Sequence, residues 1–196
     1  MNLSDSKSLN SDFFEALYQQ NPDPWQFATS EYEAQKYATT LDALPNSLYQ
    51  SGFEIGGSIG VLTEQLAKRC HSLLSVDVSE IPQRQAIDRC QHLDNIRFKL
   101  MSIPDRFPDE YFDLVVLSEV GYYWSLPDLI KAQRLILERM RPQGHLILVH
   151  WTVDARVLPL TGDAVHDAFV GLVPDRLKHI KNLTAPQYRL DLFEKV

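Results

Sequence analysis

This chain of 196 residues has only two cysteines, no long apolar run and no excess of positive charge. The two cysteines, Cys70 and Cys90, provide neither a disulfide framework nor a paired metal-ligand spacing, so we expect a reduced, cytoplasmic protein without a metal site. No apolar run approaches the roughly 20 residues that span a bilayer, so we expect no membrane association. The formal net charge of −7 disfavours a surface that binds the phosphate backbone of a nucleic acid.

Several catalytic motifs are also missing from the sequence. There is no Gly-x-Ser-x-Gly, no His-Glu-x-x-His and no Walker loop, so hydrolase, zinc-protease and NTPase interpretations have no site. Residues 1–10 are polar and lack the apolar core of a signal peptide, which predicts a flexible tail. Residues 11–196 are enough for one domain with a core, whose first helix Ser11 or Asp12 can cap.

Strands and helices alternate from residue 50 onward. Unbroken apolar strands indicate a parallel sheet covered on both faces, and right-handed crossovers then give a doubly wound α/β fold. Pro186 separates two alternating stretches, 178–183 and 188–196, which predicts an edge hairpin and a mostly parallel sheet of seven strands. The other strands are expected at 51–55, 73–77, 96–101, 111–118 and 144–150, and the helices at 11–20, 30–43, 61–69, 82–92, 126–140 and 163–171.

The segment Phe53–Gly60 carries the first functional signal. Ligands of a doubly wound sheet bind outside the carboxyl ends of its strands. There Gly56, Gly57 and Gly60 allow close approach of the backbone, and the following helix offers free N–H groups to a carboxylate or a phosphate. Asp77 ends the second strand about 20 residues later, where an acidic side chain accepts the hydroxyls of a ribose.

Glu54 distinguishes between two classes of cofactor. A nicotinamide dinucleotide carries a pyrophosphate, which gains nothing from a negative charge just before the glycines. S-Adenosylmethionine instead carries a cationic ammonium and a sulfonium, which a carboxylate suits. A tight structural turn, a surface glutamate and a nicotinamide-dependent oxidoreductase remain open alternatives on these residues alone.

The ends of the third and fourth strands extend the expected site. Met101, at the end of the third strand, and Ser102 and Ile103 after it can border an adenine ring. Ser118 and Glu119 end the fourth strand, which lies beside the first, so we expect them to face the reacting methyl group. Core packing is the competing explanation for Met101 and Ile103.

Aromatic side chains predict where the methyl acceptor binds. Tyr122, Tyr123 and Trp151 follow the fourth and fifth strands and can stack on a sugar ring or line a pocket for another small molecule. Transfer to an amine requires a neutral nitrogen, and a base can remove its proton before or after transfer.

Three residues are candidates for that base. Glu119 is the first, because it lies near the methyl group, and His150 is the second, as a histidine at the carboxyl end of a strand. His166 is the third, provided that its helix folds over the pocket. Each of them also has a purely structural interpretation.

The residues resemble class I S-adenosylmethionine-dependent methyltransferases. More narrowly, they resemble the nodulation protein S family, whose members N-methylate a glucosamine unit of a chitooligosaccharide. The resemblance covers almost the whole chain, and Ser58 departs from the class pattern by occupying the place of a glycine. It is carried by Asp23–Trp25, Tyr32–Glu33, Lys36–Tyr37, Glu54–Thr63, Val76–Ser79, Phe112–Leu114, Ser118–Tyr123, Val149–Trp151 and Gly162–His166.

The resemblance implies a Rossmann-like class I methyltransferase fold in three parts. An N-terminal helical lid would occupy residues 11–48 and a cofactor-binding core residues 49–151. A substrate-side region with the edge hairpin would occupy residues 152–196.

The resemblance also implies roles for individual residues. Trp25 and Tyr37 would close over the cofactor, with Lys36 available to its carboxylate. Val78 would lie in the cofactor site, and His166 on the substrate side.

The implied activity is N-methylation of an amino-sugar or oligosaccharide acceptor. Two alternatives stay open at this point. One is an O-, N- or S-methyltransferase with an unrelated small acceptor, and the other is a nucleotide-binding protein without turnover.

Overall fold

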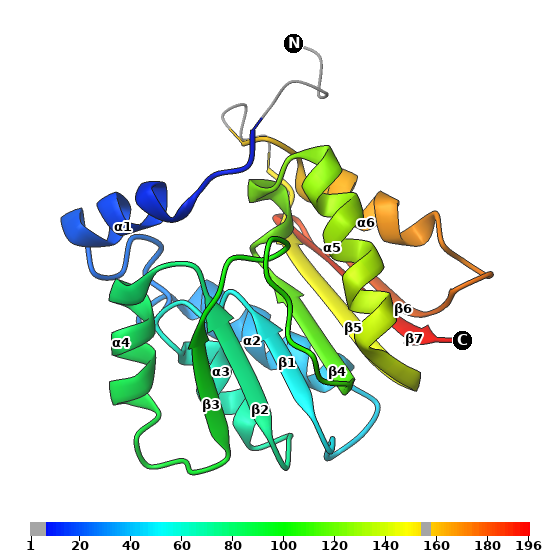
Figure 1. Cartoon of the computed structure of the whole chain (residues 1–196), viewed down its shortest axis with the longest axis horizontal. Coiled ribbons are helices and arrows are strands. Elements are labelled where there is room, and N and C mark those ends of the chain that lie inside the picture. Colours follow the sequence, from blue (N-terminus) through cyan, green and yellow to red (C-terminus); the bar gives the residue numbers. More distant parts are fainter. Residues whose placement is uncertain (1–6, 154–157) are drawn as a thin grey trace.

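One mixed sheet of seven strands, in the order β3-β2-β1-β4-β5-β7-β6, forms the centre of the computed structural model (Figure 1). The structure describes residues 7–153 and 158–196. Strands β1 to β5 run parallel, and β7 runs antiparallel to both β5 and β6. The strands are β1 (Gly52–Ile55), β2 (Leu73–Asp77), β3 (Ile96–Leu100), β4 (Phe112–Ser118), β5 (Met140–Trp151), β6 (Leu177–Thr184) and β7 (Tyr188–Lys195).

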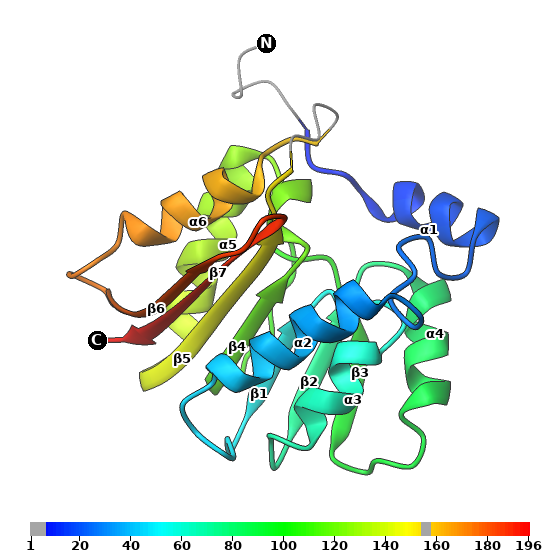
Figure 2. The same ribbon diagram turned by 180° about the vertical axis from the view of Figure 1, so that it is seen from behind.

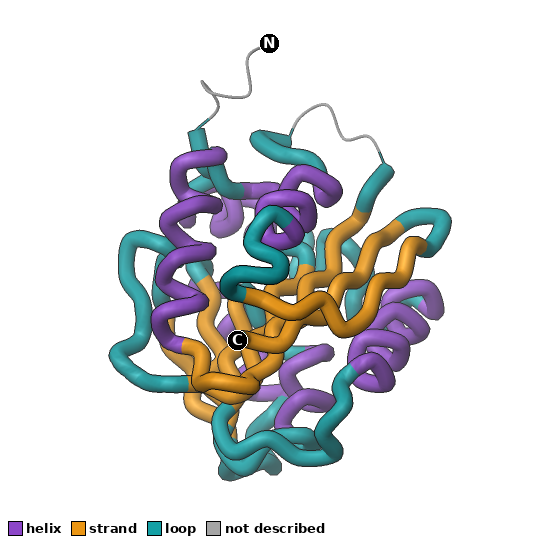
Figure 3. The backbone as a smooth tube through the Cα atoms, turned by 90° about the vertical axis from the view of Figure 1, so that its right-hand side faces the viewer, coloured by secondary structure: helices purple, strands orange, loops and turns teal. Residues whose placement is uncertain are grey.

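Helices cover both faces of this sheet. Helices α2 and α3 pack on one face and α5 and α6 on the other, while α4 lies beside α3 near the β3 edge (Figures 1 and 2). Figure 3 looks onto the other edge, where the hairpin of β6 and β7 and the C-terminus face the viewer. The helices are α1 (Ser11–Gln20), α2 (Glu31–Ala43), α3 (Val61–Ala67), α4 (Glu80–Arg89), α5 (Leu126–Arg139) and α6 (Gly162–Val170).

Strand β4 shows why the apolar runs are continuous. Leu114 and Val116 pack toward α2 and α3, whereas Val115 and Leu117 pack toward α5 and α6. All four side chains are fully buried. Because successive side chains of a strand point to opposite faces, a strand covered on both sides needs apolar residues throughout.

The predicted doubly wound fold, with five parallel strands and an edge hairpin, is confirmed. Two local features differ from the prediction. Strand β5 already begins at Met140, because that residue pairs with Phe112 at the start of β4. A 3-10 turn over Gly121–Tyr123 was not expected, and it lies directly after β4. Within the described ranges, none of the helices combines the length and the apolar character needed to cross a membrane.

Hydrogen bonds attach the N-terminal segment to the turn after β4 and to the start of α5, beginning earlier in the chain than predicted. Asn10, rather than Ser11 or Asp12, caps α1, because its side chain accepts a hydrogen bond from the backbone of the first turn. Leu9 N donates to Tyr123 O over 2.9 Å, and Ser8 Oγ accepts from Ser125 N over 2.7 Å. Residues 8–10 of the predicted tail thus form hydrogen bonds with the folded domain or with α1, and its first six residues lie outside the described ranges.

Gly60 is required for the packing of α3 against α4. Its φ is 83°, and a Cβ atom there would lie 2.8 Å from both Cα and Cβ of Ala86. We predict that Gly60→Ala lowers the free energy of unfolding by about 2 kcal/mol or more, because it adds backbone strain to a clash with a helix. Urea denaturation measures this change.

Gly171→Ala is the matched control for that variant. Gly171 has a φ of −60°, and its added Cβ atom would meet nothing closer than 3.5 Å. We expect a change within about 0.5 kcal/mol for the control. Equal losses in the two variants would contradict the role given to Gly60.

Candidate functional site

A cavity of about 470 Å³ lies at the carboxyl ends of the parallel strands, between the sheet and the N-terminal helices. Its volume falls within the range of small-molecule sites. It brings together most of the residues predicted from the sequence. Those that line it are Trp25, Lys36, Tyr37, Glu54, Gly56, Gly57, Asp77, Val78, Met101, Ser102, Ile103, Ser118, Glu119, Tyr122, Tyr123 and Trp151.

The glycine-rich turn after β1 closely approaches β2 and the segment that follows β4. A Cβ atom on Gly56, whose φ is 80°, would lie 2.2 Å from Val120 Cγ2, and one on Gly57 would lie 2.2 Å from Ser75 Oγ. Ser58 takes the next place with a φ of 49°, and its backbone N–H donates to Asp77 Oδ2 over 2.8 Å. The turn is thus folded onto the end of β2, as a glycine-rich loop before a helix allows.

Two carboxyl groups lie at the ends of β1 and β2, where Glu54 is buried and Asp77 is partly buried. Glu54 Oε2 accepts hydrogen bonds from Thr63 Oγ1 over 2.6 Å and from Ser75 Oγ over 2.7 Å. Burial nevertheless raises the pKa of Glu54 to about 7. Asp77 also accepts from Ser79 N over 2.9 Å, and burial raises the pKa of Asp77 to about 6. Ionising either group therefore has a cost that a cationic ligand would reduce.

Glu119 joins three elements of the cavity wall. Its Oε1 accepts from Lys36 Nζ of α2 over 2.6 Å. Its Oε2 accepts from the Tyr122 hydroxyl over 2.5 Å and from the backbone N–H of Trp151 over 3.0 Å. Three of the roughly four acceptor positions of the carboxylate are therefore already filled.

Glu33 is a cavity residue that sequence reasoning missed. It is 7% exposed, and its Oε1 accepts from Lys36 Nζ over 2.9 Å. Its Oε2 has no hydrogen-bond partner among the described residues, although the Tyr37 hydroxyl lies close enough to the carboxylate to interact with it. Burial raises the pKa of Glu33. The hydroxyl of Tyr32, which also lines the cavity, likewise lacks a partner within the described part of the chain.

Tyr18 of α1 is a second missed residue. Its hydroxyl lies 2.5 Å from Ser58 Oγ, and its ring packs edge-on against Trp25 at 5.7 Å between centroids. Phe14, one helical turn earlier, packs in the same manner against Tyr123 at 5.0 Å. The spacing of Phe14 and Tyr18 indicates a buried helix face, but it does not indicate what that face covers.

The two histidine predictions are wrong. His150 and His166 are fully buried and do not line the cavity. His150 Nε2 accepts from the backbone N–H of Gly121 over 3.0 Å, and burial holds the pKa of His150 well below its ordinary value. Strand alternation explains the error, because Trp151 faces the cavity and its neighbour His150 consequently points away. His150 is therefore not placed as a catalytic base, nor His166 as a substrate ligand.

Gly60, the third misplaced residue, lies outside the cavity lining. Its backbone instead faces α4, where the close approach of Ala86 accounts for the glycine. Gly60 therefore has a packing role in this structure, and its cofactor role stays a prediction.

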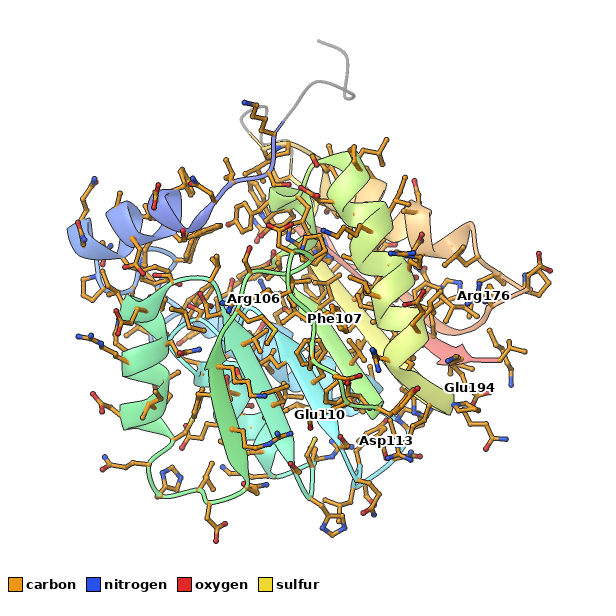
Figure 4. The ribbon with its side chains drawn as sticks, in the orientation of Figure 1. Arg106, Phe107, Glu110, Asp113, Arg176 and Glu194 are labelled. Carbon is orange, nitrogen blue, oxygen red and sulfur yellow. The ribbon has the colours of Figure 1, made fainter. Side chains whose placement is uncertain are left out.

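Carboxylates at the opposite end of the sheet have protein partners. Glu110 Oε2 lies 2.6 Å from Arg97 Nη2, and Asp113 accepts from the backbone N–H groups of Gln50 and Ser51 over 2.9 and 2.8 Å. Figure 4 shows Glu110 and Asp113 at the end of the sheet remote from α1. Glu54 and Asp77, whose pKa values are raised by burial, thus lie on the cavity side.

The buried Glu54 makes a prediction about stability and pH. Its pKa rises from an ordinary 4.5 to about 7, so between these values the folded state holds a proton that the unfolded state releases. Stability then falls as the pH rises through this window and is level above it. Across this window the ionisation of Glu54 lowers the free energy of unfolding by about 3 kcal/mol, at about 1.4 kcal/mol per pKa unit, and we expect Glu54→Gln to remove this loss.

Denaturant unfolding between pH 4.5 and 8 measures that slope. Glu138→Gln, which removes a half-exposed carboxylate from α5, is the matched control and should keep the wild-type slope. Parallel curves for wild type and Glu54→Gln would show that Glu54 ionises freely.

Two comparisons place the chain among known sequences. The sequence model of the Nodulation protein S (NodS) family matches residues 10–182. Nodulation protein S of Rhizobium tropici is 30% identical over 131 residues, and that of Bradyrhizobium diazoefficiens is 34% identical over 133 residues. Each alignment covers 64% of this chain, and the chain spans 53% and 61% of the lengths of those relatives.

Solved structures show the same architecture. The N-methyltransferase NodS of Bradyrhizobium japonicum WM9, in complex with S-adenosylhomocysteine, superposes with a TM-score of 0.81 at 22% identity, covering 95% of this chain and 99% of that one. A candidate methyltransferase of Pseudomonas syringae superposes with a TM-score of 0.75 at 30% identity, covering 85% of this chain and 100% of that one. Since the family model matches most of its length, the chain belongs to the nodulation protein S family.

Proposed function

We propose that this protein is an S-adenosylmethionine-dependent methyltransferase that N-methylates an amino-sugar or oligosaccharide acceptor. One observation carries the proposal, namely the excess of carboxylates in the wall of the cavity. Glu33, Glu54, Asp77 and Glu119 line it, and Lys36 is the one lysine or arginine among the described residues that do. Such a cavity favours a ligand that brings positive charge with it.

S-Adenosylmethionine fits this set of groups. It supplies an activated methyl group on a cationic sulfonium, and its amino acid end carries an ammonium beside a carboxylate. Asp77, Met101, Ser102 and Ile103 all line the cavity. We expect Asp77 to accept the ribose hydroxyls and the other three residues to border the adenine. Gly56 also lines the cavity, so a ligand there can approach its backbone without meeting a side chain.

A nicotinamide dinucleotide fits the same cavity less well. Its pyrophosphate carries two negative charges, and Glu54 lies buried directly before the glycine turn that would have to hold them. Lys36 is already paired with Glu33 and Glu119, at 2.9 and 2.6 Å. The charges therefore favour the sulfonium cofactor over the dinucleotide.

An amine acceptor is the second part of the proposal. A nitrogen that gains a methyl group becomes cationic, and the fixed carboxylate of Glu119 can stabilise that charge. Glu33 Oε2, which has no hydrogen-bond partner among residues 7–153 and 158–196, is available to accept a hydrogen bond from a protonated nitrogen. Tyr123 and Trp151 line the same cavity and can pack on the faces of a sugar ring.

The relatives support an amine acceptor. The superposed NodS protein is named an N-methyltransferase. A phosphoethanolamine N-methyltransferase of Haemonchus contortus superposes with a TM-score of 0.79 at 19% identity, covering 94% of this chain and 48% of that one. According to their names, both proteins transfer a methyl group to nitrogen. The carboxylates of this cavity likewise favour an acceptor that becomes cationic.

The chain's contribution to the transfer is alignment and exclusion of water. An in-line displacement at an activated methyl group needs an acceptor held at the correct distance and angle. Lys36, Tyr122 and Trp151 hold the Glu119 carboxylate in one orientation. Glu119 is therefore proposed to orient the acceptor and to stabilise its charge, and Glu33 is better placed to take a proton from it.

Mass spectrometry of reaction products tests the proposal. The protein is incubated with S-adenosylmethionine and a panel of deacetylated chitooligosaccharides and small amines, and the products are examined for the mass of one added methyl group. Matched fully acetylated chitooligosaccharides are the control, because they present the same sugar rings without a free amine. We expect methylation at least about tenfold faster with the free amine, because the carboxylates discriminate in favour of a cationic product.

Other results would redirect the proposal. Equal rates on free and acetylated sugars would contradict an amine acceptor. Methylation of small amines alone would overturn the sugar but retain N-methylation, and methylation of alcohols or thiols would overturn N-methylation itself.

A further inference from the structure

A continuous chain of buried hydrogen bonds runs behind the wall of the cavity. The backbone N–H of Gly121 donates to His150 Nε2 over 3.0 Å. His150 Nδ1 lies 3.1 Å from His166 Nε2, and His166 Nδ1 lies 2.6 Å from Asp191 Oδ2. All three side chains are fully buried. The chain connects the turn after β4 to β5, α6 and β7 in succession.

The direction of each hydrogen bond in this chain is fixed. The N–H of Gly121 can only donate, so His150 Nε2 carries no proton and the ring of His150 holds its proton on Nδ1. That proton is donated to His166 Nε2, so His166 in turn holds its proton on Nδ1 and donates it to the carboxylate of Asp191. Both rings are therefore neutral, and neither can take up another proton without losing one of these bonds.

Asp191 is the acceptor at the end of the chain. Its oxygens also accept from Arg189 Nε over 2.7 Å, Asn182 Nδ2 over 2.8 Å and His179 Nε2 over 2.6 Å. Burial alone would raise the pKa of Asp191, but the hydrogen bonds from His166 and Asn182 outweigh it and lower the pKa. The carboxylate thus stays ionised, and as the final acceptor it keeps the proton of each histidine on Nδ1.

The other end of the chain holds part of the cavity wall. A Cβ atom on Gly121 would lie 2.6 Å from Val165 Cγ1 and 3.0 Å from His150 Nε2, so the turn is packed directly on the histidine. The ring of Tyr122 contacts His150 edge-on, at 5.4 Å between centroids, and the hydroxyl of Tyr122 donates to Glu119. A displaced turn would therefore move the Tyr122 hydroxyl and release Glu119.

We propose that Asp191, His166 and His150 are positioning residues, which fix the Gly121–Tyr123 turn and through it the orientation of the Glu119 carboxylate. The two histidines neither touch the acceptor nor take its proton. Their effect on turnover rests on the proposed methyltransferase function, whereas the tautomers and the bond to Gly121 do not.

Side-chain nitrogen NMR of the full chain, labelled with ¹⁵N-histidine, tests which ring nitrogen of each histidine carries the proton. We expect His150 and His166 to show neutral rings with the proton on Nδ1, and to keep these signals from about pH 5 to pH 8 because burial and partners oppose protonation. The charged side chains that act on them are Lys36 for His150, and Asp191, Arg189 and Asp163 for His166. A proton on Nε2 of either ring, or charging of either ring in this range, would overturn the proposal.

Two substitutions at one position separate the two bonds of His150. In His150→Gln the amide oxygen can replace Nε2 and accept from Gly121 N–H, whereas in His150→Asn the shorter side chain can replace only Nδ1. We expect hydrogen exchange of the Gly121 amide to accelerate at least about tenfold in His150→Asn and less than about threefold in His150→Gln. Equal exchange rates in the two variants would overturn the proposal.

The same pair tests the link to catalysis. With the panel amine that wild type methylates fastest, we expect kcat of His150→Asn to fall at least about tenfold and that of His150→Gln to stay within about threefold, with the KM for S-adenosylmethionine nearly unchanged in both. Equal kcat in the two variants would refute the positioning role. If wild type binds no S-adenosylhomocysteine, the proposed function fails, while the NMR and exchange results still decide whether the chain of bonds exists.

Discussion

The Glu119 carboxylate connects helix α2 to the carboxyl ends of β4 and β5 through hydrogen bonds. Its donors are a lysine of α2, a tyrosine of the turn after β4 and a backbone N–H at the end of β5. Glu119 itself has a φ of 56°, a conformation that costs energy in a residue other than glycine. The three hydrogen bonds offset that cost, and they place Lys36, Tyr122 and Trp151 around one cavity. Without Glu119, the hydrogen bonds that connect α2, the turn after β4 and the end of β5 across the cavity would be lost.

Much of the cofactor half of this site could be predicted from the sequence. In a doubly wound sheet the carboxyl ends of neighbouring parallel strands meet, so Glu54, Asp77 and Glu119 had to lie near one another once their strands were identified. The glycine turn was identifiable because Gly56 and Gly57 have no room for a side chain. At these positions the residue pattern identifies the strand ends, and the topology of the sheet then brings those ends together.

The remaining residues depend on tertiary packing that a linear pattern does not contain. Tyr18 reaches Ser58 only because α1 folds back over the cavity, and its helical spacing reveals a buried face but not the partner. His150 was misplaced by one step of strand alternation, since the direction of a side chain at a strand end depends on register rather than on residue type. Glu33 has no motif of its own, and its free oxygen becomes visible only beside Lys36 and Tyr32.

Calorimetric titration of the full chain tests the central claim, which is that the cavity is built for an adenosyl cofactor rather than a dinucleotide. S-Adenosylhomocysteine and NAD are titrated in parallel into wild type and Asp77→Ala. We predict that wild type binds S-adenosylhomocysteine at one site, that Asp77→Ala binds it at least about tenfold more weakly through loss of charge-assisted hydrogen bonds, and that NAD does not bind. Binding of NAD without binding of S-adenosylhomocysteine would contradict the account.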